Sequence, residues 1–576
     1  MKTKIFLLLF ALLVTLFAGC ASEKESGSSP IPETSSDLIS SSCSLSKETD
    51  TASDDLVLAE LGLSKTAEGG AAPESMRTEH SQNLYVKDFG AIGDGVTDDS
   101  MAVTAAIEAL RTAGDGSILY FEPNKVYYFG EGSYALSLVG LRNVTVKGEN
   151  TTILAKSIMG LCLLHANQNV VLDGFRFDYA TKPYALAEVV EADLESGEMV
   201  IRTDRSLHIT EEYRQPVGDY FGVVDREEGR YHIGIDAYRV LNAKEHLYKV
   251  ACNDVFTGRE ERMRMLLEGD RFIIPMPHIG QVIEQAFTVL DNRDFTMRNC
   301  QVWSAAKFMF FLCGNEGIFR FSNVDIIPSP QEEGIRFVGW RDGFHCKENR
   351  GRLIWENCSA RYLYDDLFNI SASMLQVERR EARQILLYWP ERGTPYAYAQ
   401  PGDTISFFDT DTGKWIGTTI LESVEVRGNA IAVTLKEELE GIRAGAGCKA
   451  IVDSLAAPDS RIQGGDFQGS FRFRSPLYVT DSRLHVTRMW LNAEPPLEGP
   501  IARNILFSHC DFTFDRNGQK FLHIDSGNRR WASAGDKAYC VRNILFRYCH
   551  IKRDCVDIGP AEEAGGLVRF EHCSEG

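Results

Sequence analysis

The sequence has no excess of positive charge. Its 61 Lys and Arg residues stand against 81 Asp and Glu, which gives a formal net charge of −20, and the acids are spread along the chain rather than gathered in a tail. A protein that binds nucleic acid presents a basic face to the phosphates. The charge therefore argues against nucleic acid as a partner and favours a neutral or cationic one.

Motifs for metal or phosphate binding are also missing. No set of His, Cys and Glu residues has the spacing of metal ligands, and no glycine-rich loop precedes a helix as phosphate binding requires. We therefore predict no metal and no other cofactor.

Long hydrophobic runs are absent after the N-terminus. Two lysines precede the apolar residues 5–17, and a pair of small residues then leads to Cys20. This order is typical of a bacterial lipoprotein signal, in which cleavage before Cys20 is followed by lipidation of its sulfur. An ordinary secretory signal or a short membrane span is the alternative, although the run is short for a span.

The segment after the signal has few aromatic residues. Residues 20–81 are rich in Ser, Glu, Thr, Ala and Gly, a composition that predicts a flexible tether. We expect the protein in the bacterial cell envelope, held at the outer membrane or the cell surface by a lipid anchor on Cys20.

Helical periodicity is almost absent after residue 115. A short alternating strand, a polar corner and another short strand recur instead at a spacing of roughly 20–25 residues, which is the pattern of a parallel β-helix. A β-sandwich built from hairpins is the alternative, and the scarcity of Asn-Gly and Asp-Gly turns argues against it. We predict an all-β fold, a right-handed parallel β-helix. The repeated segments are residues 143–148, 169–175, 293–302, 352–360, 504–512 and 543–551.

The cysteines follow the same repeat. The chain has 14 of them, Cys20 included, and an exported protein with so many invites a disulfide framework. Five recur at one position of the repeat, which favours an inward-facing stack of small buried thiols instead. These are Cys300, Cys358, Cys510, Cys549 and Cys573.

Two segments interrupt the repeat and one precedes it. Residues 185–275 and 384–453 both contain Gly-Asp followed by an apolar strand, and we predict two related small β-barrels inserted as loops that wall the site. Residues 86–100 resemble the opening of pectate-lyase-like β-helices and lead into a short capping helix over 101–113. The predicted division is a signal at 1–19, the tether at 20–81, the three parts of the β-helix at 82–184, 276–383 and 454–576, and barrels at 185–275 and 384–453.

Three aspartates are the strongest candidates for chemistry. Asp342 and Asp365 are 23 residues apart (365 − 342), about one coil, and Asp366 follows directly. Acids this close repel one another and cannot all ionise at ordinary pKa values, which allows acid and base roles to be divided. Neighbouring coils lie about 5 Å apart, so acids with a lateral offset can reach the roughly 6.5–9.5 Å separation of an inverting glycosidase. Asp365 and Asp366 can both contribute only at a corner or bulge, and the structural alternative is a turn and a solvated corner.

The blocks around these acids resemble a known family. Trp-Arg-Asp-Gly at 340–343 and Tyr-Asp-Asp-Leu-Phe-Asn at 364–369 are similar to glycoside hydrolase family 110, the inverting exo-α-1,3-galactosidases that act on blood-group-B and related linear glycans. The resemblance covers about residues 82–576. It implies Asp365 as the general acid, and Asp342 with Asp366 as the pair that holds the attacking water.

Other functions stay open. Polygalacturonases also place one Asp a coil before an Asp-Asp pair, but their later Gly-His-Gly and Arg-Ile-Lys blocks are missing here. A polysaccharide lyase or polygalacturonase-like enzyme is the first alternative, and a glycan-binding surface lipoprotein without catalysis is the second. Predicted substrate-binding residues are Trp340, Arg341, His345 and Asn369, followed by Trp303, Trp490, His485 and Arg488.

Overall fold

The computed structural model describes most of the chain after residue 53. The described ranges are 54–64, 72–156, 159–214, 221–226, 229–254, 258–266, 271–277, 285–332, 334–389, 398–409, 414–445, 447–490, 498–499, 502–514, 522–524, 542–551, 556–558, 568–571 and 573–575.

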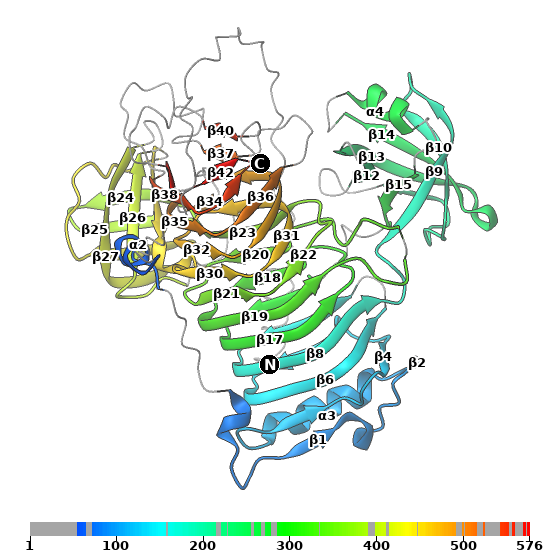
Figure 1. Ribbon diagram of the computed structural model, residues 1–576, viewed down its shortest axis with the longest axis horizontal. Helices are drawn as coiled ribbons and strands as arrows, with labels where there is room; N and C mark the ends of the chain where they lie inside the picture. The colour runs from blue at the N-terminus through cyan, green and yellow to red at the C-terminus, as the bar shows by residue number, and fades with distance from the viewer. Residues whose placement is uncertain are drawn as a thin grey trace.

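A 29-stranded sheet wound into a coil forms the body of the molecule (Figure 1). Its strands pair in parallel with their equivalents on neighbouring coils, and a short antiparallel contact joins β23 to β34. The all-β fold and the parallel β-helix predicted from the repeat are confirmed.

The coil strands form parallel columns. The column that carries the candidate site contains β5 (Tyr134–Val139), β7 (Gly160–His165), β16 (Phe287–Leu290), β18 (Phe310–Cys313), β20 (Phe344–Lys347) and β23 (Asp366–Ser373). A second column contains β6 (Arg142–Ala155), β8 (Gln168–Tyr179), β17 (Arg293–Val302), β19 (Glu316–Ile326), β21 (Arg352–Glu356), β30 (Ser460–Gln463), β32 (Leu477–Thr480), β35 (Arg503–Ser508), β38 (Arg542–Arg547) and β41 (Val568–Glu571). The other coil strands are β1 (Asn83–Tyr85), β2 (Asp94–Asp98), β3 (Ile118–Tyr120), β4 (Val126–Phe129), β22 (Ser359–Ala360), β31 (Asp466–Phe473), β33 (Arg483–Trp490), β34 (Glu498–Gly499), β36 (Asp511–Phe514), β37 (Leu522–Ile524), β39 (His550–Ile551), β40 (Val556–Ile558) and β42 (Ser574–Glu575).

A column of phenylalanines fills the core beneath the candidate site. Phe287, Phe310, Phe344 and Phe368 stack on successive coils with ring centroids 4.4, 4.9 and 5.2 Å apart. Phe471 continues the column 6.1 Å from Phe368. Aromatic rings at this spacing interact favourably beyond their buried area, so the coils are held in register directly under the acids.

Four of the repeated segments begin with an asparagine because of the backbone conformation at that position. Asn143, Asn169, Asn504 and Asn543 have φ of 48, 53, 54 and 55°, in the left-handed region that Asn tolerates better than most residues. Their side chains also link coils, because the Asn169 amide donates to Asn143 at 3.0 Å and Asn543 donates to Asn504 at 2.8 Å. The asparagine of the repeat therefore reflects a left-handed turn, and the residues after it reflect a strand.

Two barrels interrupt the coil and lie on opposite sides of it in Figure 1. The first is a closed ring of β9 (Tyr184–Asp193), β10 (Glu198–Thr203), β14 (Leu247–Asn253), β13 (Gly229–Asn242), β12 (Phe221–Arg226) and β15 (Arg271–Pro275), with β11 (Glu212–Arg214) paired to β13 and α4 (Arg259–Leu266) beside it. The second is the closed ring of β24 (Leu375–Glu381), β25 (Gln384–Tyr388), β28 (Ala430–Leu435), β27 (Lys414–Arg427), β26 (Thr404–Asp409) and β29 (Cys448–Val452). The second ring thus begins at Leu375, ahead of the boundary expected at residue 384.

One helix covers the N-terminal end of the coil. Helix α3 (Ser100–Thr112) packs on the first coils, near the cap expected at residues 101–113, and buries Val103, Ile107 and Leu110. Short 3₁₀ turns lie at η2 (Pro73–Met76), η3 (Val86–Phe89), η4 (Ala243–Glu245) and η5 (Asp453–Leu455). Within the described ranges, none of the helices has the length and apolar character needed to cross a bilayer.

One part of the expected tether is packed on the coil. Helix α2 (Asp54–Leu61) lies against β32, β35 and β38, where Asp54 accepts hydrogen bonds from Ser508 at 2.7 Å and from Arg547 at 3.1 Å. The expectation of a flexible tether over 20–81 therefore fails for residues 54–64, because three leucines find an apolar surface. The packed side chains are Leu58, Leu61 and Leu63 with Tyr478, Leu506 and Leu545.

The repeated cysteines are free thiols. Four of them are buried, and Cys573 is half-buried. Burial raises the pKa of Cys300 and of Cys358 to about 12. The inward stack predicted from the repeat is confirmed for the four buried members. Cys20 and the signal lie outside the described residues.

Candidate active site

Two neighbouring coils bring the acids together. Strands β20 and β23 pair with an offset of 24 residues, as Phe344 lies opposite Phe368 (368 − 344). The same offset holds on the other side of the acids, at the bridge from residue 339 to residue 363. It places Asp342 beside Asp366, so the 23-residue equivalence expected between Asp342 and Asp365 is one residue off.

Close approach of the two coils depends on Gly343. Its amide donates to the Asp366 carbonyl at 2.9 Å, and a Cβ at this position would lie 2.7 Å from both the side chain and the carbonyl oxygen of Leu367. Distances under 3.0 Å are not tolerated by real Cβ atoms. Glycine after Asp342 is therefore required for the two carboxylates to face each other.

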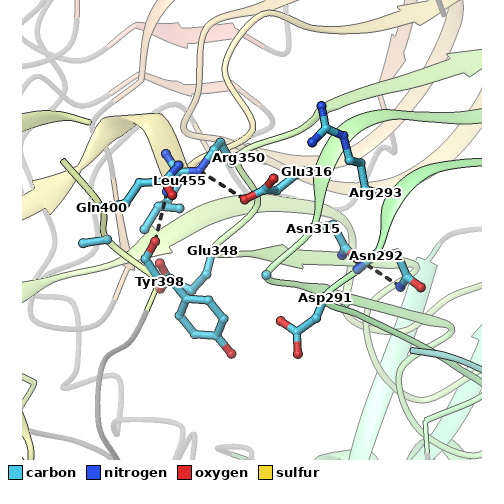
Figure 2. Close-up of a pocket in the computed structure, with 12 residues that line it drawn as sticks. Asp291, Asn292, Arg293, Asn315, Glu316, Glu348, Arg350, Tyr398, Gln400 and Leu455 are labelled. Atoms are coloured by element: carbon cyan, nitrogen blue, oxygen red, sulfur yellow. Dashed lines mark hydrogen bonds and ion pairs between the residues drawn. The ribbon is translucent and has the colours of Figure 1, made fainter. Parts of the chain in front are cut away.

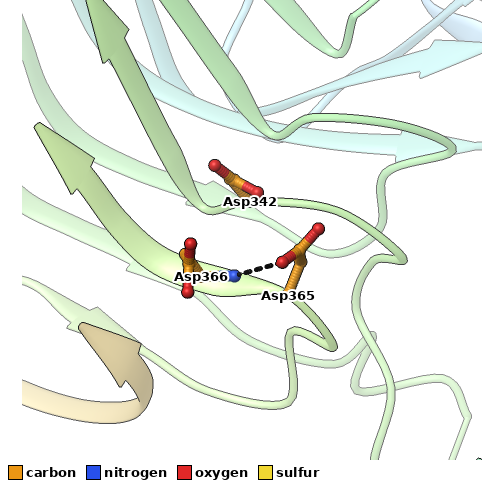
Figure 3. A group of neighbouring side chains, drawn as sticks. All are labelled: Asp342, Asp365 and Asp366. Carbon is orange, nitrogen blue, oxygen red and sulfur yellow. Dashed lines mark hydrogen bonds between the residues drawn. The ribbon is translucent and has the colours of Figure 1, made fainter. Parts of the chain in front are cut away.

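The Asp365-Asp366 pair sits where a turn becomes a strand. The Asp366 amide donates to the Asp365 carboxylate at 3.0 Å (Figure 3). On its other side β23 pairs with β31, and the register shifts between Asp366 and Phe368. Such an irregularity lets two consecutive side chains contribute to one site, which is the corner or bulge that the sequence required.

The three carboxylates form one cluster. One oxygen of each lies within 4.8 Å of one oxygen of the others. Two acceptors that share one water at about 2.8 Å lie about 4.6 Å apart, so the cluster has the dimensions to hold a water. This spacing between oxygen atoms is shorter than the roughly 6.5–9.5 Å between the carboxyl groups of an inverting pair.

The acids differ in exposure. The Asp365 side chain is 29% exposed, whereas those of Asp342 and Asp366 are 4% and 2% exposed. Asp365 is therefore the one carboxyl group of the three that is open to solvent, and the other two are buried.

The pKa of Asp365 is raised to about 6. Burial is the largest cause, and the negative charges of Asp342 and Asp366 act in the same direction, against Arg341 and Arg472. A carboxyl group with this pKa is still protonated in part near neutral pH, as a general acid must be.

Asp366 is held by β31. Ser470 Oγ donates to Asp366 Oδ1 at 2.6 Å, and the Arg472 guanidinium forms an ion pair with Asp366 Oδ2. Sequence reasoning missed both residues. Ser470 lies 104 residues beyond Asp366, after the second barrel, and nothing in its local sequence indicates a contact.

Asp342 is held by His345. The distance from His345 Nδ1 to Asp342 Oδ2 is 2.6 Å, and His345 is 6% exposed. Its ring lies against Phe308 and Phe311, with centroids 4.6 and 5.7 Å away. His345 was predicted to bind substrate. In the structure its Nδ1 contacts the Asp342 carboxylate instead.

Arg341 contacts Asp365. Its Nε lies 3.3 Å from Asp365 Oδ2, and its guanidinium lies 5.2 Å from the centre of the Phe308 ring. The side chain is 17% exposed, so it can also face a substrate. The spacing of the three acids would also suit a cation, but the guanidinium groups of Arg341 and Arg472 lower the attraction of the cluster for one.

Trp340 is not a stacking surface for a sugar. The side chain is 0% exposed and packs on Phe337 and on Phe221 of the first barrel, with ring centroids 4.5 and 6.0 Å away. The prediction that Trp340 binds substrate is therefore wrong in this structure. The first barrel packs against the Trp340 ring and buries it, and this contact fixes the loop that carries Arg341 and Asp342.

The other predicted residues are dispersed. Asn369 is buried beside His345 on the next coil and accepts a hydrogen bond from Ser371 at 3.1 Å. Trp303 is 6% exposed, and His485 lies 3.5 Å from an acid of β31. The predictions for the side chains of Arg488 and Trp490 lie outside what the structure describes.

A separate pocket of about 320 Å³ lies at the other ends of β16, β18 and β20 (Figure 2). It is built on a ladder of buried asparagines, in which Asn292 and Asn315 occupy equivalent positions on neighbouring coils. Arg350 pairs there with Asp403 and lies 3.8 Å from Glu316. None of the predicted site residues lines this pocket.

The fold and the cluster define the class of the protein: a parallel β-helix with three convergent aspartates on neighbouring coils. The resemblance expected from the blocks around these acids is confirmed by similarity to α-1,3-galactosidase B of Bacteroides thetaiotaomicron. The two are 25% identical over an alignment of 500 residues, and the match covers 81% of this chain and 76% of that protein. No family model matches the chain.

Two solved structures are also similar. The chain matches the A-module of mannuronan C-5 epimerase AlgE4 from Azotobacter vinelandii with a TM-score of 0.34 and 9% identity, over 86% of this chain and 95% of that one. It matches the family 28 exopolygalacturonase of Yersinia enterocolitica with a TM-score of 0.38 and 10% identity, over 86% of this chain and 71% of that one.

Proposed function

We propose that the protein is a glycoside hydrolase that removes terminal α-1,3-linked galactose from glycans with inversion. The observation that carries the proposal is the division of the cluster into one reachable acid with a raised pKa, Asp365, and two buried carboxylates, Asp342 and Asp366. Two carboxyl groups in different environments are what acid–base cleavage of a glycosidic bond needs. Similarity to an α-1,3-galactosidase over 81% of the chain supports a glycosidase in general.

In this mechanism Asp365 is the general acid. Its proton passes to the glycosidic oxygen as the bond from that oxygen to the anomeric carbon breaks. A proton donor at this point typically contributes 10²–10⁴-fold to the rate. Arg341, 3.3 Å away, stabilises the carboxylate that remains.

Asp342 and Asp366 hold the attacking water. The water oxygen bonds to the anomeric carbon on the face opposite the leaving group, and its proton passes to one of these carboxylates. Both oxygens of Asp366 already have partners, Ser470 and Arg472, which supports a role in binding water rather than in direct covalent attack. The first product is then β-galactose from an α-linked substrate.

The decisive experiment has two readouts. The first is a panel of α-1,3-, α-1,4- and α-1,6-linked galactosides, on which we expect selective release of galactose from the α-1,3 linkage. Within the α-1,3-linked substrates, linear glycans are compared with fucosylated blood-group-B glycans. The second is proton NMR of the first-formed sugar before mutarotation. Initial α-galactose would mean retention and would overturn the assignment of the three acids.

Variants test the roles of the residues. Asp365→Asn should bind galactosides but lose turnover by about 10²–10⁴-fold. Asp291→Asn is the matched control, because Asp291 is an exposed acid in the separate pocket and lies 3.6 Å from a histidine. We expect the control to keep wild-type activity.

The alternatives have their own signatures. Arg341 and Arg472 beside the acids are the feature that a uronate-binding lyase or polygalacturonase would also use. An unsaturated product absorbing in the ultraviolet would identify a lyase, and release of galacturonate would identify a pectin hydrolase. Glycan binding by the wild type without any turnover would identify a binding lipoprotein.

We also propose that the protein is anchored in the bacterial envelope through a lipid on Cys20, with the described residues held away from the membrane. The support is the order of basic, apolar and small residues before Cys20. Cys20→Ala should move the protein from the membrane fraction to the soluble fraction. Wild-type protein that is already soluble would remove the anchor without affecting the proposed activity.

A further inference from the structure

Every carboxylate of the cluster has its own basic partner. Two of these partners are guanidinium groups, which keep their charge at all relevant pH values, and the third is an imidazole, which titrates near neutral pH. The pairs are Arg341 with Asp365, Arg472 with Asp366, and His345 with Asp342. The three otherwise similar acids are thereby made different.

His345 is enclosed. It is 6% exposed, its ring is packed by Phe308 and Phe311, and it lies opposite Asn369 on the next coil. With the ring fixed on both sides, the 2.6 Å contact from Nδ1 to Asp342 also fixes that carboxylate. A hydrogen bond to an ionised acceptor is among the stronger ones in proteins.

Two groups of the cluster can take a proton near neutral pH, Asp365 and His345. Protonation of one makes protonation of the other less favourable, because their charges interact across a site of low dielectric constant. Interacting groups of this kind titrate as a unit rather than separately.

The cations near His345 keep their charge near neutral pH. Its neighbours Phe308, Phe311 on β18 and Asn369 on β23 carry no charge. The remaining charged groups are the carboxylates and guanidinium groups of the cluster and Lys347, two residues further along β20. None of these cations titrates in the range of histidine.

We infer that His345 is a positioning residue that holds Asp342 and shares a single proton with Asp365. The inference rests on the proposed function. In the active state the proton is on Asp365, and neutral His345 donates Nδ1–H to Asp342. With the proton on His345, Asp365 is ionised and has nothing to give to the leaving oxygen. At lower pH His345 takes a second proton, and the imidazolium pairs with Asp342 and weakens that carboxylate as the base. The imidazole thus sets the acidic limb of the pH profile.

The kinetic test is the profile of kcat/KM against pH on an uncharged galactoside. His345→Gln keeps a donor for Asp342 and removes the titration, so its acidic limb should move at least one pH unit lower. The alkaline limb should stay in place or move lower, because a neutral residue no longer shares the proton with Asp365. His345→Phe keeps the packing and removes the donor, and it should lose about tenfold or more in kcat relative to His345→Gln.

His165→Gln is the matched control. His165 also lies near a carboxylate, 3.6 Å from Asp291, but it belongs to the separate pocket side of β7. Its profile should match that of the wild type. An acidic limb that is the same in the wild type and in His345→Gln would overturn the inference.

A second measurement needs no turnover. With ¹⁵N-labelled histidine, the signal of His345 among the 12 histidines is the one that disappears in His345→Gln. In Asp365→Asn the negative charge that favours the imidazolium is gone, so His345 should protonate at lower pH than in the wild type. Identical titration in both proteins would refute the shared proton, whereas coupled titration in a protein without galactosidase activity would refute only the proposed function.

Discussion

Replacing Asp342 with Asn should lower the pH at which activity is lost on the alkaline side. The alkaline limb of kcat/KM reports loss of the Asp365 proton, and the negative charge of Asp342 is one of the causes that raise the pKa of Asp365. Removing that charge makes the proton easier to lose. Loss of the base should also reduce the rate at the optimum by about 10²–10⁴-fold.

The size of the shift follows from the structure. The pKa of Asp365 rises from 3.8 to about 6, which corresponds to about 3 kcal/mol. Two charges 4.8 Å apart at an effective dielectric constant of about 20 interact by about 3.5 kcal/mol, enough alone to explain the whole rise. Because burial contributes more than Asp342, the share of Asp342 is smaller. We therefore expect the limb to move by about 0.5–1 pH unit.

The assay is kcat/KM from pH 4 to 9 on one α-1,3-galactoside, with Asp291→Asn as the control for an unrelated carboxylate. The control should reproduce the wild-type limb. A limb that stays in place or moves to higher pH in Asp342→Asn would refute the electrostatic origin of the raised pKa. It would also remove Asp365 from the role of general acid.

Three further outcomes follow. Asp365→Asn should raise the free energy of unfolding by up to about 3 kcal/mol at pH 7 and by almost nothing below pH 4. The reason is that the pKa of Asp365 is about 3.9 in the unfolded state and about 6 in the folded state, so ionisation above pH 4 destabilises the folded wild type. Chemical denaturation at both pH values checks this. Leu58→Ala should cost about 2–5 kcal/mol of local stability and expose β35 and β38 to hydrogen exchange, whereas Leu56→Ala on the same helix, at a side chain 68% exposed, should not. Cys300 and Cys358 should not react with a thiol reagent at pH 8 until the protein unfolds, because burial raises their pKa to about 12. Reaction in the native state would show that the inward stack opens.

The coil and its acids were predictable because their signals are local and periodic. Strand, corner and cysteine recur along the chain, and each coil must bury the same face against the next. Asp342, Asp365 and Asp366 lie within two consecutive coils with no insertion between them, so their proximity follows from the period. Two inserted barrels were predictable for the same reason, as places where the period stops.

Register, face and distant contacts were decided only by the tertiary structure. A coil of 24 residues rather than 23 puts Asp342 beside Asp366, and that offset depends on how the backbones pair around Gly343. Trp340 is core because the first barrel docks on it.

The largest omissions came from segments that are remote along the chain. Arg472 reaches Asp366 only because the coil resumes after the second barrel and places β31 beside β23. Helix α2 has the composition of a tether, yet Leu58 is 1% exposed, because strands near the C-terminus supply the surface it covers. Periodicity within a chain determines which residues repeat, whereas contacts between remote segments depend on the surfaces that appear only when the coils have stacked.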